Sequence, residues 1–350
     1  MPNEITMMSQ GGWGKMNAHS WSEVLPPALR SILMRLPERM LDELEEVRVR
    51  EERPLEVSTM GEFHFVTKDG TVTDKPDTAY RPNREDSLQL LDYVTNHSLY
   101  TMEEELRRGF ITVAGGHRIG LAGRTVLTQG RVSHLRDITG FNLRIAREVA
   151  GIADEIIPQL LDFAHRTIYS TLVVSPPQHG KTTMLRDMAR AVSSGCWNHP
   201  QAVWKALKVG IVDERSEIAG CMKGVPSYNL GYRTDVIDGC PKAEGLMMFI
   251  RSMSPDVLVV DEFGREEDYD AMQEAIHAGV RMIASVHGSD VEDILRRPGL
   301  ASLLDEGGFS RIVVLRRTSR QWQRKVYDGK LRALQPGLVS KIRGGGGCHV

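Results

Sequence analysis

Up to about residue 150, apolar residues either recur at helical spacing or alternate with polar ones. Helical spacing predicts helices at 21–44, where prolines divide the segment in two, at 85–95 and at 101–108. Alternation predicts strands at 47–50, 54–60, 62–67, 110–127 and 141–147, the second and third forming a hairpin. This part of the chain therefore predicts a small α+β domain.

Beyond residue 150 the pattern changes to short, continuous apolar runs rich in Val, Ile and Leu. The runs lie at 171–175, 208–213, 256–261, 281–287 and 311–317. Continuous runs are typical of strands buried on both faces, so they predict a mainly parallel sheet covered by helices. The helices are expected at 155–163, 182–192 and 291–297, the last with a capping box of Ser289 and Glu292 and an end at Pro298.

The two patterns predict an α/β fold with two domains. We expect a flexible arm at 1–20, an α+β domain at 21–150, an α/β domain at 151–335 and a flexible tail at 336–350. The boundary is placed near 149–154, where Gly151 precedes the first helix of the second domain.

Composition and charge exclude some classes of protein. Of the 350 residues, 41% are hydrophobic and 26% charged, which fits a globular chain and excludes collagen and low-complexity polymers. No apolar run reaches the roughly 20 residues of a membrane-spanning helix. Four scattered cysteines form neither a disulfide framework nor a zinc pattern. Because the start of the chain also has no secretory signal pattern, we expect a cytoplasmic protein.

The formal net charge of −2 conceals an uneven distribution. Residues 311–343 contain ten Lys or Arg and one acid, whereas the rest of the chain is acidic. This segment could bind anionic lipid or nucleic acid. Its alternation also fits a hairpin at the sheet edge whose charges resist aggregation, and we favour the hairpin.

A phosphate-binding loop is the strongest chemical signal. The sequence SPPQHGKTT follows a predicted strand and opens a predicted helix, as a Walker A loop does, with Ser175 at the position of the usual first Gly. Gly180 permits a close approach to phosphate, Lys181 supplies the cation, Thr182 a Mg²⁺ ligand and Thr183 a further hydroxyl. The loop predicts a nucleotide site made by Ser175, Pro176, Pro177, Gln178, His179, Gly180, Lys181, Thr182 and Thr183.

A second motif, DVLVVDEFGR at 256–265, is a buried strand that ends in two carboxylates, as a Walker B segment does. Asp261 is placed to hold Mg²⁺ together with Thr182, and Glu262 to orient or deprotonate the attacking water. Two acids after the apolar run favour hydrolysis of the nucleotide over binding alone.

Two other predicted strands end in polar residues that could reach the same crevice, because ligands of parallel sheets sit beyond the carboxyl ends of the strands. Glu214 could assist the activation of water, and His287 could sense the terminal phosphate. Asp213 and Arg215 could take part directly or form a local ion pair. The predicted catalytic residues are thus Glu262, Lys181 and Glu214, with His287 at the nucleotide.

The block 173–288 resembles the secretion-ATPase branch of RecA-like enzymes, the motors of type II and type IV secretion. The matching segments are IVDERSEIAG, VLVVDEFGR and IASVHGSD. Segments 110–124, 141–151 and 231–266 resemble more closely the stage III sporulation family. This resemblance implies ATP and Mg²⁺ as ligands, a hexameric ring, and membrane proteins of the channel between mother cell and forespore as partners. It implies a cytoplasmic, peripheral position on the mother-cell side of that membrane.

In this branch, arginines from the N-terminal domain or from a neighbouring subunit approach the terminal phosphate. The candidates in this sequence are Arg118, Arg124, Arg144, Arg147, Arg233 and Arg265. The residues alone do not choose among them.

The sequence leaves three functions open. The first is a Mg²⁺-dependent ATP hydrolase. The second is a nucleic-acid-stimulated translocating ATPase that uses the same core and the basic segment, although no nucleic-acid-binding signature supports it. The third is a nucleotide-gated scaffold that does not hydrolyse ATP.

Overall fold

The computed structural model describes residues 20–59, 61–95, 106–107, 109–128, 130–146, 149–317 and 322–335. The expected arm, the expected tail, most of the helix predicted at 101–108 and Arg147 lie outside these residues. Within them, no helix combines the length and the apolar character needed to cross a membrane.

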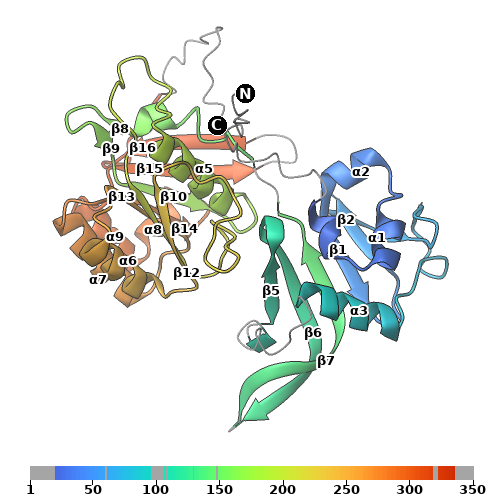
Figure 1. Ribbon diagram of the computed structural model, residues 1–350. Helices are drawn as coiled ribbons and strands as arrows, with labels where there is room; N and C mark the ends of the chain where they lie inside the picture. Colours follow the sequence, from blue (N-terminus) through green and yellow to red (C-terminus); the bar gives the residue numbers. More distant parts are fainter. Residues whose placement is uncertain are drawn as a thin grey trace, which may run out of the picture.

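The N-terminal part is built on an antiparallel sheet with the strand order β4-β3-β2-β1-β7-β6-β5 (Figure 1). Its strands are β1 (Leu44–Arg50), β2 (Glu56–Thr59), β3 (Glu62–Val66), β4 (Val72–Thr73), β5 (Phe110–Val113), β6 (His117–Thr128) and β7 (Arg131–Arg144). Its helices are η1 (Ser20–Val24), α1 (Pro27–Leu33), α2 (Glu38–Glu43), α3 (Arg84–Val94) and η3 (Ala114–Gly116). The predicted hairpin is confirmed, because β2 and β3 pair antiparallel.

The C-terminal part is built on a second sheet with the order β12-β11-β13-β14-β10-β15-β16. Its strands are β10 (Thr171–Ser175), β11 (Val209–Asp213), β12 (Thr234–Asp238), β13 (Val257–Val260), β14 (Arg281–His287), β15 (Arg311–Arg317) and β16 (Trp322–Asp328). Every pairing is parallel except that of β15 with β16. The predicted parallel sheet is confirmed, and the basic segment forms the predicted hairpin, with β16 at the sheet edge.

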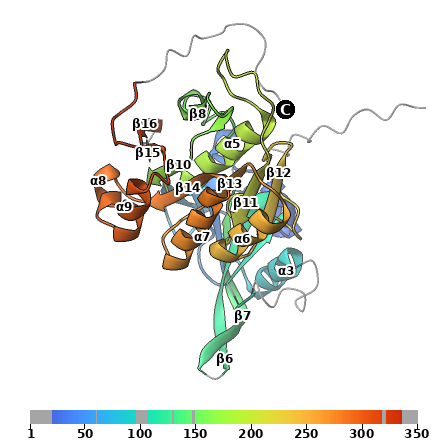
Figure 2. The ribbon, with the colours of Figure 1, turned by 90° about the vertical axis from the view of Figure 1, so that its left-hand side faces the viewer.

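Helices cover both faces of the parallel sheet, as the continuous apolar runs predict. They are α5 (Lys181–Ser194), α6 (Lys242–Ser252), α7 (Glu266–His277), α8 (Val291–Leu295) and α9 (Pro298–Asp305). Figure 2 shows α5 on one side of the sheet and α6, α7 and α9 on the other. Along β10, Val173 packs in the core that contains α5, whereas Leu172 and Val174 pack in the opposite core with α6 to α9. Alternate side chains of one strand thus fill two cores, because successive residues of a strand point to opposite faces.

Two predicted helices differ in the structure. The helix predicted at 155–163 is wrong: the segment forms a short 3-10 turn, η4 (Ile157–Leu160), followed by β8 (Leu161–Asp162), which pairs with β9 (Thr167–Ile168). Pro158 has no N–H to donate, and Gln159 bonds three residues back, to Ile156. In α8 the N-cap is Asp290, not Ser289, because its carboxylate accepts the Asp293 N–H at 2.9 Å.

The structure also contains elements that the pattern did not predict. Strand β12 is only partly buried, and the helices α6, α7 and α9 cover one face of the sheet. Helix α9 begins at Pro298, where the sequence suggested only an end. Among the described cysteines, Cys221 and Cys240 are free thiols.

A buried histidine in β6 gives the fold a pH dependence that can be tested. His117 is 2% exposed, its Nδ1 accepts the Ala146 N–H at 3.0 Å, and burial lowers its pKa from 6.5 to about 4. Between these values the unfolded chain binds a proton that the folded chain does not. Stability is therefore complete above pH 6.5 and decreases toward pH 4, by up to about 1.4 kcal/mol per pH unit.

Urea unfolding at pH 7.5, 6 and 5 measures this dependence. The variant His117→Asn keeps an acceptor oxygen but cannot be protonated in this range, so its stability should decrease less with acidification. The control His64→Asn, at a half-buried site, should keep the wild-type slope. Equal slopes in wild type and His117→Asn would contradict the assignment.

Candidate functional site

A cleft of about 600 Å³ opens at the carboxyl edge of the parallel sheet. Most of its lining comes from the predicted phosphate loop and from the ends of β13 and β14, and a smaller part from the N-terminal part of the chain. The lining residues are Glu45, Ile145, Val149, Pro176, Pro177, Gln178, Gly180, Lys181, Thr182, Thr183, Glu217, Glu262 and His287. Two predicted loop residues, Ser175 and His179, are not among them.

The predicted loop connects β10 to α5 in a conformation suited to an anion. Ser175 is fully buried at the end of β10, and its hydroxyl donates to the Pro176 carbonyl at 3.1 Å. Gln178 and Gly180 have φ angles of 63° and 79°, the left-handed region. Gly180 is the N-cap of α5, and no side chain caps this helix. The first-turn N–H groups of α5 therefore face the cleft as possible anion donors.

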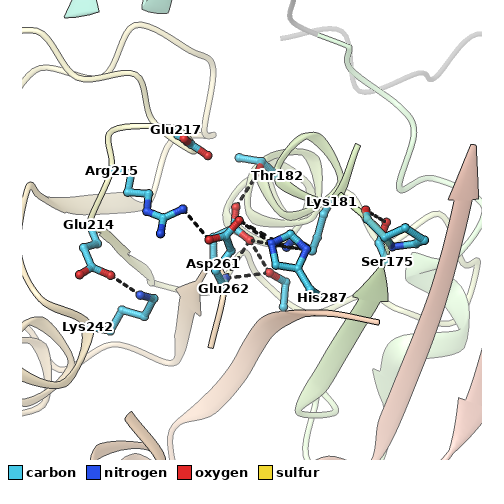
Figure 3. Close-up of polar contacts among 12 residues, drawn as sticks. Ser175, Lys181, Thr182, Glu214, Arg215, Glu217, Lys242, Asp261, Glu262 and His287 are labelled. Carbon is cyan, nitrogen blue, oxygen red and sulfur yellow. Dashed lines mark hydrogen bonds and ion pairs between the residues drawn. The ribbon is translucent and has the colours of Figure 1, made fainter. Parts of the chain in front are cut away.

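The hydroxyl of Thr182 and the carboxylate of Asp261 meet beside the loop. Thr182 Oγ1 donates to Asp261 Oδ2 at 2.6 Å, and the Ser285 hydroxyl donates to Asp261 Oδ1 (Figure 3). The Glu262 N–H also points to this group, at 2.9 Å from Asp261 Oδ1 and 3.0 Å from Ser285 Oγ. The two predicted metal ligands thus lie together, although they are 79 residues apart in the chain.

Lys181 lies between the two acidic residues and a histidine. Its side chain is 6% exposed, and its Nζ is 3.9 Å from Asp261 Oδ1, 3.7 Å from Glu262 Oε1 and 3.2 Å from His287 Nδ1. Burial lowers the pKa of Lys181, although the charges of Asp261 and Glu262 oppose the shift. A phosphate in the cleft would supply further negative charge beside this buried ammonium.

Glu262 has a backbone conformation that is unusual for a residue with a side chain. Its φ is 53°, and the two hydrogen bonds of its N–H hold it there. The carboxylate is bound on both oxygens: His287 Nε2 lies 2.9 Å from Oε1, and Arg215 Nη1 donates to Oε2 at 2.6 Å. Burial raises the pKa of Glu262, but the charges of Lys181 and Arg215 outweigh burial and lower it overall.

Glu214 lies at the edge of this cluster, where it lines a small cavity of about 20 Å³ together with Arg215, Asp261 and Glu262. Its carboxylate binds the Lys242 ammonium, and Arg265 Nη1 is 3.7 Å from its other oxygen. Figure 3 shows this pair apart from Lys181 and His287. Burial raises the pKa of Glu214, but Lys242 and the nearby arginines lower it overall. The structure thus holds Glu214 in an ion pair, and its assistance to the attacking water stays a prediction.

Asp213 and Arg215 do not form the local ion pair that the sequence allowed. The Asp213 carboxylate is buried and accepts the N–H groups of Glu217 at 2.9 Å and Ala219 at 2.8 Å. Burial raises its pKa to about 6. Asp213 thus shapes the loop that follows β11, while Arg215 is left to bind Glu262.

One candidate arginine of the sequence, Arg118, reaches a residue of the cleft, and the other described candidates lie away from it. Arg118 of β6 bridges the two parts of the chain, with Nη1 2.7 Å from Glu217 Oε1. The guanidinium of Arg144 binds Glu46 at 3.2 Å, that of Arg265 approaches Glu214, and that of Arg233 donates to the Ala206 carbonyl. Arg124 is exposed on β6, and Arg147 lies outside the described residues. Among the described candidates, none contacts Asp261 or Glu262.

Several charges of the basic C-terminal segment are already bound within the chain. Arg316 donates to the Ser289 carbonyl at 2.8 Å, Arg324 binds Glu155, and Arg332 binds Asp328. These contacts fit the hairpin interpretation of the segment.

The site's donors fit Mg²⁺ held jointly with a substrate. A hydroxyl and one carboxylate are hard oxygen ligands, which Mg²⁺ prefers, and this ion usually keeps several waters and binds substrate phosphates. Among the described residues there is no group of three His, Cys, Asp or Glu that could hold a metal ion by protein ligands alone.

Comparison with known proteins gives consistent results. The family described as "Sporulation stage III, protein AA" matches residues 17–333. The chain is 47% identical to the stage III sporulation protein AA of Bacillus subtilis over 321 residues, covering 92% of this chain and 93% of that protein.

Solved structures of ATPases share the fold. The structure is similar to the ATPase DotB of Yersinia pseudotuberculosis, with a TM-score of 0.54 and 13% identity over 83% of this chain and 77% of that one. The pilus retraction motor PilT with bound ADP gives a TM-score of 0.52 and 16% identity over 84% and 79%. The predicted fold class, a RecA-like α/β core after a smaller α+β part, is confirmed.

Proposed function

Because the chain belongs to the stage III sporulation protein AA family, we propose that it is a Mg²⁺-dependent ATP hydrolase of the sporulation machinery. The observation that carries the proposal is that Lys181, Thr182 and Glu262 line one cleft, where the Thr182 hydroxyl binds the Asp261 carboxylate. The fold shared with the ATPases DotB and PilT is compatible with this activity.

In this proposal the loop residues and the N-terminus of α5 bind the phosphates of ATP, and Lys181 contacts the outer ones. Thr182 and Asp261 would hold Mg²⁺, which when bound neutralises charge on the phosphates. Ser175 and His179, two predicted loop residues that do not line the cleft, would act through the shape of the loop.

Glu262 would orient the attacking water and accept its proton. The water oxygen forms a bond to the γ-phosphorus as the bond between that phosphorus and the β–γ bridging oxygen breaks. ADP leaves with the electron pair of that bond, and the proton passes from Glu262 to phosphate or solvent. His287, which contacts both Lys181 and Glu262, would detect the terminal phosphate.

The assembly proposed from the sequence rests on the family. We propose that the α/β part (151–335) hydrolyses ATP in a homo-hexamer and that the α+β part (21–150) transmits the change to membrane proteins of the sporulation channel. The protein would then be cytoplasmic and peripheral to the membrane on the mother-cell side. The contact between Arg118 and Glu217 could transmit a change in the cleft to the N-terminal part, because it joins the N-terminal sheet to a residue of the cleft.

Phosphate release from ATP, with Mg²⁺ and with EDTA, tests the proposed function. We expect turnover that depends on Mg²⁺ and falls to background in EDTA, because one carboxylate and one hydroxyl cannot replace the ion's charge. Single-stranded DNA or RNA should leave the rate unchanged. Strong stimulation by polynucleotide would favour the translocase instead, and binding of ATP without any phosphate release would favour the scaffold.

A further inference from the structure

We propose that Arg215 is a positioning residue that holds Glu262 and moves to the terminal phosphate when ATP binds. This inference rests on the proposed function and deepens it, because it assigns an arginine of the same chain to the γ-phosphate. The arginines expected at the terminal phosphate from the resemblance lie in the N-terminal part or in a neighbouring subunit, or are Arg233 and Arg265.

The position of Arg215 supports the proposal first. It is the second residue after β11, and its Nη1 lies 2.6 Å from Glu262 Oε2. The other oxygen of the same carboxylate is 3.7 Å from Lys181 Nζ, the proposed phosphate cation. The Glu262 carboxylate therefore lies between the Arg215 guanidinium and the Lys181 ammonium (Figure 3).

The exposure of the Arg215 side chain is a second observation that supports the proposal. The Arg215 side chain is 57% exposed, whereas that of Glu262 is 27% exposed and is held by its backbone and by His287. If one partner of this pair moves, it is the arginine. A guanidinium has several donors in one plane and can bind a phosphate and a carboxylate in turn.

The charges around Glu262 explain why Arg215 would move when ATP binds. Arg215 Nη1 lies 2.6 Å from Glu262 Oε2, and Lys181 Nζ lies 3.7 Å from the other oxygen, Oε1. The γ-phosphate is a stronger anion, so it would draw Arg215 and Lys181 toward itself. The departure of Arg215 would leave Glu262 Oε2 open to the attacking water when ATP is in place.

This arrangement predicts that Arg215 distinguishes ATP from ADP, since only ATP carries the phosphate that attracts it. In Arg215→Gln we expect an unchanged dissociation constant for ADP. The constant for a non-hydrolysable ATP analogue should rise about tenfold. The kcat for ATP should fall about 100-fold or more, since an arginine at the transferring phosphoryl group contributes at least this much.

Two further variants complete the experiment. Arg215→Lys keeps the charge without the planar donors, so it should recover part of the affinity for the ATP analogue and little of kcat. Arg251→Gln, an exposed arginine at the end of α6, should match wild type in all three measurements. Thermal unfolding of each variant identifies any that fail to fold, and Arg215→Lys then carries the test.

A kcat for Arg215→Gln within threefold of wild type would overturn the proposal. So would equal weakening of ADP and ATP-analogue binding, which is what a merely structural role produces. If the wild-type protein hydrolyses no ATP, the proposed function fails. The comparison of ADP with the ATP analogue then still decides whether Arg215 recognises the terminal phosphate.

Discussion

Replacement of Lys181 by alanine is expected to abolish ATP hydrolysis and to weaken ATP binding by about 100-fold or more. The lysine ammonium is buried at the floor of the cleft, where a charge-assisted hydrogen bond to phosphate is stronger than in water. Its removal also takes away the cation beside Asp261 and one of the cations beside Glu262, so the site would repel an incoming phosphate. Titration with a fluorescent ATP analogue, together with phosphate release, measures both effects.

Lys208→Ala is the matched control for this variant. Lys208 lines a different cleft, at the opposite edge of the same sheet, with Asp256 and Arg281. Its replacement should leave ATP binding and turnover at wild-type values. If Lys181→Ala binds ATP as tightly as wild type while remaining folded, the phosphate loop does not bind the nucleotide as described.

Glu262→Gln should bind ATP normally but reduce kcat by about 10²- to 10⁴-fold, the usual contribution of a general base. The amide has nearly the shape of the carboxylate and keeps an oxygen for Arg215, but it cannot accept a proton from water. Loss of the negative charge beside Lys181 should make ATP binding slightly tighter, because one anion no longer opposes the phosphate. Single-turnover phosphate release and equilibrium binding separate the two effects.

Glu267→Gln, an exposed residue in the first turn of α7, tests whether any nearby loss of charge has the same effect. It should hydrolyse ATP at the wild-type rate. Turnover in Glu262→Gln close to that of wild type would show that another group activates the water. Glu214 is then the next residue to replace.

The sequence predicted the parallel sheet well because its strands are buried on both faces. Every residue of β10 and β11 is buried. Each strand therefore appears in the sequence as a short, continuous apolar run. Strand β12 was missed because it is half exposed at the edge of the sheet and carries Asp235 and Asp238 among its five residues. The segment at 155–163 has apolar residues at helical spacing, but spacing alone does not reveal how Pro158 and the tertiary core bend it.

The candidate site was predictable where a sequence motif indicates both the place of a residue in the fold and its chemical role. Lys181, Thr182, Asp261 and Glu262 each lie at a strand or helix end, so the parallel topology alone brings them together. The partners of Glu214 and Glu262 were not predictable, because an ion pair depends on side-chain directions across separate loops. The position of Arg215 just after the end of β11 was a signal in the sequence. The sequence could not show, however, that Asp213 binds backbone N–H groups and so does not pair with Arg215.

The most direct test of the account is single-turnover release of phosphate from ATP by the wild-type protein in excess over nucleotide, with Mg²⁺, beside Lys181→Ala under the same conditions. We expect wild type to convert all bound ATP to ADP and phosphate, and Lys181→Ala to release none above background. Equal release by both proteins, or wild-type protein that binds ATP and leaves it intact, would contradict the claim that this cleft hydrolyses ATP.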